Sequence, residues 1–150
     1  FRGETGVLYG EQAAWFAQKR ALSPNKKCLL LTHHQPFCIY KTPPEDFERR
    51  LRPVAEAELI NAWIWGHEHG CVLYGPHDGI QYPILLGHGG FPQRPMQRRV
   101  GGPPVKFEWT ATTTHGDLVF GFAVFDFADD CIGVQLIDQD AKVQHSFTIK

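Results

Sequence analysis

The sequence lacks both a long apolar run and an excess of charge of one sign. None of its apolar stretches approaches the ~20 residues that a membrane-spanning helix needs, and no signal peptide is visible. Its 15 Lys and Arg nearly balance its 16 Asp and Glu, which leaves a net charge of −1. Electrostatics therefore gives no reason to expect nucleic acid or an acidic membrane surface as a partner.

Cysteine is scarce and shows no paired spacing. The four cysteines are Cys28, Cys38, Cys71 and Cys131, and none forms a Cys-x-x-Cys motif. This pattern favours buried free thiols in a reducing compartment, and so a cytoplasmic location, although it does not exclude a disulfide. With 43% hydrophobic and 21% charged residues in 150, we expect one globular domain over residues 1–150.

Two histidines follow a short apolar stretch near the middle of the chain. Ala62–Trp65 is suited to a buried strand, which Gly66 would end. If the chain continues in an extended form, His67 and His69 point to the same side while Glu68 points away. Two imidazoles placed in this way suit one metal ion or two neighbouring ions. The alternative is a pair of ordinary surface histidines, because a lone His-x-His motif is a weak signal.

A second apolar stretch also leads directly into histidines. Cys28–Thr32 has the pattern of a buried strand, and His33 and His34 follow it. Ligands collect at the carboxyl ends of strands in α/β sheets. Two strands that each end in imidazoles therefore favour a shared site over chance.

The remaining pattern predicts helix and strand in the first half and antiparallel strands in the second. Helices are expected over Glu11–Leu22, with Trp15 and Phe16 as its apolar face, and over Glu45–Leu51. Further strands are expected over Cys71–Tyr74, Ile80–Leu86, Lys106–Thr110, Leu118–Phe127, Cys131–Ile137 and Lys142–Ile149, with a surface loop over Gly87–Pro104. The last three strands form a meander, and Trp63 and Trp65 are expected in the core.

With both histidine motifs in place, the chain resembles the C-terminal half of a calcineurin-like metallophosphoesterase. The resemblance is carried by the run from Leu29 to Pro36, Leu-Leu-Leu-Thr-His-His-Gln-Pro, and by Gly66-His67-Glu68-His69. It implies an α/β fold: the C-terminal portion of an α/β/β/α sandwich of two mixed sheets that ends in an antiparallel meander. It also implies a phosphoric ester hydrolase, a phosphatase or phosphodiesterase with a small phosphoester substrate.

The resemblance further implies two divalent metal ions, Mn, Fe or Zn. By matched position, His33 and His67 would bind one ion and His69 its neighbour. His34 would contact phosphate or support the ligands, as the catalytic residue of the set. The additional Gln35 before the proline leaves open whether His33 or His34 is the ligand.

The chain departs from the family by lacking the motifs of the N-terminal half. It has no Asp-x-His and no Asn-His, and its Gly116-Asp117 follows the His-Glu-His motif instead of preceding it. We therefore expect a fragment that is inactive alone. The alternatives are a non-catalytic metal- or partner-binding module and one half of a split enzyme. Unpaired strand edges predict association with the missing N-terminal half or with itself.

Other polar residues near the motifs have weaker claims to function. His88, in a glycine-rich loop after an apolar strand, would either touch substrate or belong to a plain turn, and the turn is favoured. Arg94, Arg98 and Arg99 are suited to holding a phosphate, but a solvated surface is the simpler interpretation.

Overall fold

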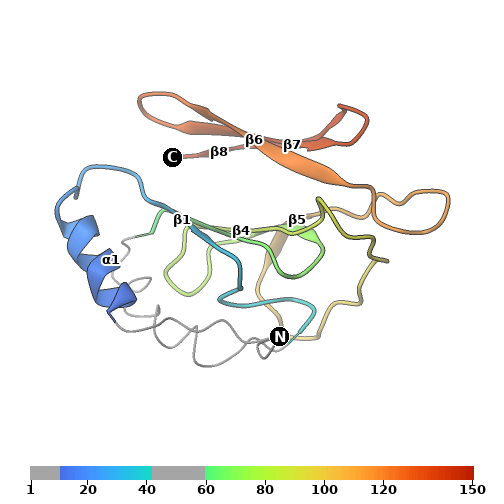
Figure 1. Cartoon of the computed structure of the whole chain (residues 1–150), viewed down its shortest axis with the longest axis horizontal. Helices are drawn as coiled ribbons and strands as arrows, with labels where there is room; N and C mark the ends of the chain where they lie inside the picture. Colours follow the sequence, from blue (N-terminus) through green and yellow to red (C-terminus); the bar gives the residue numbers. More distant parts are fainter. Residues whose placement is uncertain (1–10, 42–59) are drawn as a thin grey trace.

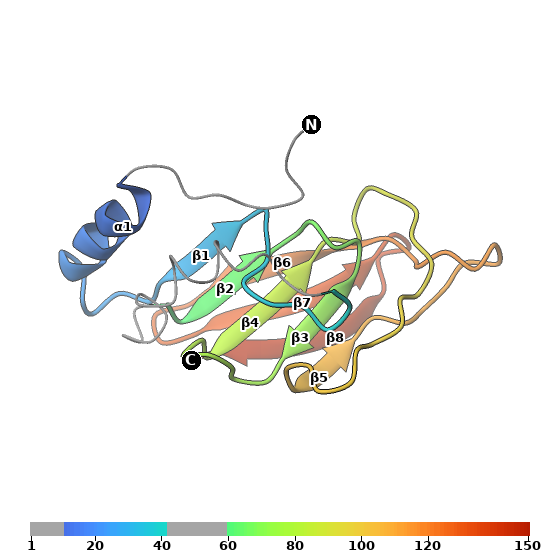
Figure 2. The same ribbon diagram turned by 90° about the horizontal axis from the view of Figure 1, so that it is seen from below.

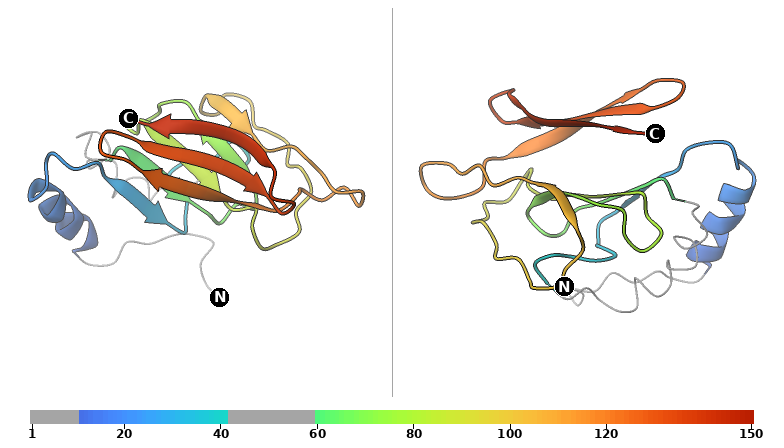
Figure 3. Two further views of the ribbon diagram at one scale, coloured as in Figure 1. Left: turned by 90° about the horizontal axis from the view of Figure 1, so that it is seen from above. Right: turned by 180° about the vertical axis from the view of Figure 1, so that it is seen from behind.

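The computed structural model describes residues 11–41 and 60–150, which form one helix and two stacked sheets (Figure 1). The elements are α1 (Gln12–Ala21), β1 (Leu29–Thr32), β2 (Ala62–Trp65), β3 (Cys71–Tyr74), β4 (Tyr82–Leu86), β5 (Val105–Glu108), β6 (Gly121–Phe127), β7 (Ile132–Asp138) and β8 (Val143–Ile149). The two sheets lie face to face, and α1 lies beside the first sheet on the side away from the second (Figure 3).

The first sheet is mixed, with strand order β1-β2-β4-β3-β5. Strands β1, β2 and β4 are parallel, with Leu29 opposite Ala62 and Thr32 opposite Trp65, whereas β3 and β5 add antiparallel neighbours. Because β1 and β2 are parallel in this register, the residues after Thr32 and after Trp65 leave the sheet at the same end, where the C-termini of these strands lie. Both histidine motifs lie at that end of the sheet.

The central strands are buried on both faces, and alternate residues fill two different cores. From β2, Trp63 and Trp65 face the side of α1, while Ala62 and Ile64 face the second sheet. All four are buried, which explains why this strand reads as a continuous apolar run and not as an alternating one.

The second sheet is purely antiparallel, with strand order β6-β7-β8. Along β7 the buried residues Ile132, Val134 and Leu136 face the first sheet, and the residues between them are more exposed. This alternation is typical of a sheet with one solvated face. The ring of His145 on β8 stacks on Phe107 of β5 at 4.3 Å, so the β8 edge lies over the β5 edge. Within the two described sheets, the other edge strands, β1 and β6, consequently lie on the opposite side (Figure 2).

The predicted elements agree with these bounds to within a few residues. All the predicted strands are present, the loop over Gly87–Pro104 is free of strands, and Trp63 and Trp65 are buried. The α/β fold with two stacked sheets that ends in an antiparallel meander is confirmed; the first sheet is mixed and the second is antiparallel. One detail was wrong: Trp15 is 58% exposed, and of the two aromatic residues of the helix only Phe16 packs on the core. The predicted helix over Glu45–Leu51 lies outside the described residues.

The structure also tests the expectations of free thiols and of no membrane-spanning helix. Cys28, Cys38, Cys71 and Cys131 are all free, as the sequence favoured. Among the described residues, no helix has the length and apolar character to cross a bilayer.

Replacing a buried tryptophan should destabilise the fold much more than replacing an exposed one. Trp65 is 1% exposed and stacks on Tyr74 at 5.5 Å, so Trp65→Ala should lower the free energy of unfolding by about 3–5 kcal/mol. Trp15→Ala, the matched control on the exposed face of α1, should change it by less than about 1 kcal/mol. Urea denaturation measures both, and equal losses would contradict this assignment of the core.

Candidate metal centre

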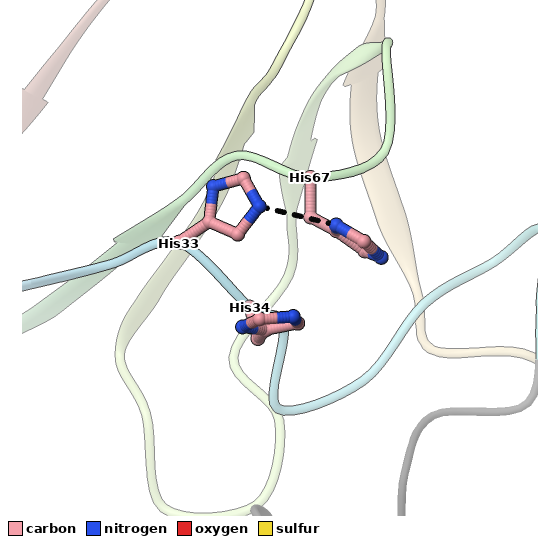
Figure 4. Close-up of side chains that lie close together, drawn as sticks. All are labelled: His33, His34 and His67. Carbon is pink, nitrogen blue, oxygen red and sulfur yellow. Dashed lines mark hydrogen bonds between the residues drawn. The ribbon is translucent and has the colours of Figure 1, made fainter. Parts of the chain in front are cut away.

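Three histidines from two strand ends come together beside the first sheet. His33 and His34 follow β1, His67 follows β2, and their rings face one another (Figure 4). Nδ1 of His67 lies 3.2 Å from Nε2 of His33, and the ring centroids are 4.7–5.1 Å apart. One ring nitrogen from each of the three lies within 4.8 Å of the others.

Local bonds hold the two strand ends in place. The amide of Gly66 donates to the carbonyl of His33 at 3.2 Å, so the parallel pairing continues one residue beyond each strand. The Thr32 hydroxyl donates to the His34 carbonyl at 2.8 Å and accepts a bond from Nε1 of Trp63 at 2.8 Å. The buried tryptophan thereby anchors the turn that carries His33 and His34.

The three imidazoles are a candidate ligand set for a single first-row transition metal ion. Tetrahedral ligands at about 2.0–2.1 Å from zinc lie about 3.3 Å apart, close to the 3.2 Å between His67 and His33. Imidazole nitrogen suits zinc and iron, whereas manganese prefers carboxylates. Among residues 11–41 and 60–150, this is the one group of three or more such side chains close enough to share an ion.

The surroundings of His34 and His67 favour the neutral imidazole, which is the form that binds metals. Burial lowers the pKa of His34, and the neighbouring His33 lowers it further. Burial also lowers the pKa of His67, with smaller contributions from His34, His33, Lys41 and His69. A neutral imidazole has a free lone pair, so proton competition with a metal ion is reduced.

His69 is not part of this cluster. His67 has a φ of 64°, so the loop is not extended and the two histidines do not simply alternate. The ring of His69 lies 4.8 Å from Phe91, which is 60% exposed. The structure thus brings His33, His34 and His67 together, and places His69 beside Phe91.

Glu68 points into the protein, away from the histidines on either side. It is 3% exposed, and neither carboxylate oxygen has a hydrogen-bond partner. Burial raises its pKa to about 7, against smaller opposing effects that include the Cys38 thiol and Lys41. Its backbone packs so closely on Gly87 that a Cβ there would lie 1.8 Å from the Glu68 carbonyl oxygen. An extended loop predicts that Glu68 points away from the two histidines, but it does not predict that the Glu68 side chain is buried.

His88 is a buried residue and not a surface turn. It is 2% exposed, its ring lies 4.5 Å from Trp109, and both ring nitrogens lack partners. A Cβ at residue 121 would lie 2.7 Å from Nε2 of His88, so Gly121 leaves room for the ring. Burial lowers the pKa of His88 to about 4. His88 is therefore a neutral group packed between the two sheets.

Two of the three arginines of the long loop form contacts within the protein. Arg98 pairs with Glu108, which also accepts a bond from the Tyr40 hydroxyl at 2.6 Å. Arg99 donates to the Lys41 carbonyl at 3.1 Å. Arg94 is exposed, in keeping with a solvated surface.

Comparison with known proteins gives a remote but consistent answer. No protein-family profile matches the chain. Tartrate-resistant acid phosphatase type 5 of Homo sapiens is 24% identical over 134 residues, which cover 87% of this chain and 40% of the relative. The Rattus norvegicus protein of the same name is 22% identical, with coverage of 87% and 39%. The chain thus spans about 40% of the length of the curated relatives it matches.

Two solved structures share the arrangement of strands. GAP50, the anchor in the inner membrane complex of Plasmodium, has a TM-score of 0.63 at 19% identity, with 91% of this chain and 42% of that chain covered. Purple acid phosphatase PPD1 from seeds of yellow lupin (Lupinus luteus) has a TM-score of 0.58 at 14% identity, with 96% and 29% covered. The chain has a metallophosphoesterase-like fold. The metallophosphoesterase-like arrangement agrees with the resemblance found in the sequence motifs.

The buried His88 should make stability depend on pH in a defined window. The unfolded chain takes up a proton at this residue below pH ~6.5, whereas the folded chain does so only near its pKa of about 4. The free energy of unfolding should therefore fall as the pH is lowered through this window, by on the order of 3 kcal/mol from this residue. His88→Leu removes the contribution.

Urea denaturation of both proteins from pH 7 to pH 4, in a chelator, measures the effect. The stability of wild type relative to His88→Leu should decline across the window. Glu68 contributes a slope of opposite sign to both proteins, which cancels in the difference. A difference that does not change with pH would show that His88 is not held neutral.

Proposed function

We propose that this chain supplies the histidine side of a metal centre in a phosphoric ester hydrolase that acts on phosphomonoesters or phosphodiesters. The observation that carries the proposal is the convergence of His33, His34 and His67 from two parallel strand ends. The metallophosphoesterase-like fold and the acid phosphatase relatives agree with it.

Each histidine would have its own role in the proposed metal centre. His33 and His67, 3.2 Å apart, would hold one divalent ion, and His34 is close enough to complete the same set or to contact a phosphate oxygen. By its place in the His-Glu-His motif, His69 would bind a second ion, although its ring lies beside Phe91 in this structure. A bound ion would lower the pKa of a coordinated water so that it attacks phosphorus at neutral pH. The imidazoles would orient the ion and, being neutral, leave its Lewis acidity intact.

Residues 11–41 and 60–150 do not by themselves complete a two-metal centre. Among the described residues, no carboxylate joins the three histidines. In the part of the chain that the structure describes, β1 is an edge strand of the first sheet, and a further parallel strand beside it would end next to His33. We propose that another polypeptide segment supplies the remaining ligands there, and that the chain alone is inactive or nearly so. The cytoplasmic location stays a prediction.

A second candidate function is a binding or anchoring module without catalysis. The solved structure of GAP50 has a TM-score of 0.63 to this chain and is described as an anchor. In this alternative the histidines are vestigial and bind no metal tightly. Metal affinity and hydrolysis distinguish the two candidates.

Zinc binding tests the histidine cluster directly. Wild type should take up one zinc ion per chain in an isothermal titration. His33→Ala, His34→Ala and His67→Ala should each weaken zinc binding, because each removes one of three ligands. Loss of a group that only supports a ligand already weakens metal binding by about 10-fold or more, so loss of a ligand should cost at least 10-fold. His69→Ala should leave this first ion bound. His115→Ala, at an exposed turn, is the control. Absence of tight uptake by wild type would favour the anchoring module.

Hydrolysis of 4-nitrophenyl phosphate tests the need for further ligands. The chain with manganese, iron or zinc should show no turnover above the metal alone. Addition of a separately produced polypeptide that carries the Asp-x-His, Gly-Asp and Asn-His motifs should give activity that His67→Ala abolishes. If the mixture is no more active than either piece, the shared centre is wrong.

A further inference from the structure

Three parallel strands deliver their loops to the same end of the first sheet. Strands β1, β2 and β4 run in one direction (Figure 2), with Trp65 of β2 opposite Leu85 of β4. A Cβ at Gly66 would lie 3.9 Å from the carbonyl oxygens of both His33 and Leu86, so the three strand ends are neighbours. The loop that follows β4 therefore begins beside the two loops that carry the histidines.

The loop after β4 is fixed against the His-Glu-His loop. The Gly87 amide donates to the Gly70 carbonyl at 2.8 Å. Gly87 also lies so close to Glu68 that a side chain at residue 87 would clash with the Glu68 backbone. The position of one loop is therefore set by the other.

Phe91 lies on a short exposed span between two fixed points of this loop. On one side, His88 is buried between the two sheets. On the other side, the Gln93 carbonyl accepts a bond from the Leu118 amide at 2.8 Å. Residues 89–92 between them are all exposed, and Phe91 itself is 60% exposed. An aromatic ring is thus held at the surface by anchors that do not bury it.

The ring of Phe91 contacts His69, which lies two residues after the cluster residue His67. The centroids of the two rings are 4.8 Å apart and their planes are inclined by 37°. This contact occupies one side of the Phe91 ring, and the exposed fraction leaves the rest open to a ligand. Sites for small molecules combine a few polar groups with apolar and aromatic walls of this kind.

We propose that Phe91 is a specificity-determining residue of the candidate metal centre, which favours phosphoric esters whose organic group is an aromatic ring. The inference rests on the proposed function, because the phosphate of the ester would be held at the ion. Phe91 supplies neither a metal ligand nor a proton. It stabilises the bound ester by stacking and apolar contact, which in an aromatic pair raise affinity by about 2- to 12-fold.

Two phosphonates that cannot be hydrolysed as esters provide the test. Phenylphosphonate and methylphosphonate offer the same anionic group but differ in the organic group that Phe91 would contact. A zinc ion with three protein ligands keeps a fourth position open for such an anion. Isothermal titration of the zinc-loaded chain with each compound gives the ratio of the two affinities.

The matched variants are Phe91→Ala, Phe91→Trp and the control Phe127→Ala. Phe127 is 69% exposed, like Phe91, but it ends β6. Gly121, which approaches His88, begins that strand, about 20 Å away at the usual rise per residue. Zinc uptake by each variant, which should equal that of wild type, shows that the centre is intact.

Wild type, Phe91→Trp and Phe127→Ala should bind phenylphosphonate about 2- to 12-fold more tightly than methylphosphonate. Phe91→Ala should bind the two about equally, with its affinity for methylphosphonate unchanged. A wild type without the preference, a Phe91→Ala variant that keeps it, or a Phe91→Trp variant that loses it would overturn this inference and leave the proposed function standing. A wild type that takes up no zinc, or whose zinc-loaded form binds neither phosphonate, would overturn both.

Discussion

The parallel pairing of β1 with β2 is the constraint on which the candidate site depends. Parallel neighbours end at the same edge of a sheet, so segments 34 residues apart in sequence, at His33 and His67, are brought to 3.2 Å between ring nitrogens. An antiparallel pairing of the same two strands would place the imidazoles at opposite edges. The hydrogen bond from the Gly66 amide to the His33 carbonyl extends this pairing into the two loops and fixes their position relative to each other.

The pairing is maintained because the strands are buried on both faces. Trp63 and Trp65 fill the core beside α1, while Ile64 packs toward the second sheet. A one-residue slip of β2 would exchange these faces and move large indoles into a space shaped for smaller side chains. The Trp63 to Thr32 bond links this packing to the turn that carries His33 and His34. The core therefore positions the histidines as well as stabilising the fold.

The immediate surroundings of the loops contain several buried polar groups without partners. The carboxylate of Glu68 and both ring nitrogens of His88 are buried and have no hydrogen bonds among the described residues. Their pKa values move in opposite directions, to about 7 and about 4, because burial favours the neutral form of each. His88 is thus kept neutral at pH 7, and Glu68 stays protonated to a much higher pH than an exposed carboxyl group would.

The sequence by itself determined the strands, their order along the chain and the two histidine motifs. Strand periodicity, glycine turns and apolar runs are local properties, so β2 and β3 could be assigned to the residue and the final meander nearly so. Which histidines converge was decided only by tertiary structure. His67 adopts a φ of 64°, the ring of His69 lies beside Phe91, and the ring of His34 lies beside that of His67. The burial of Glu68 and His88 depended likewise on contacts with Gly87, Trp109 and Gly121, which are distant in sequence or on other strands, and no local pattern encodes such contacts.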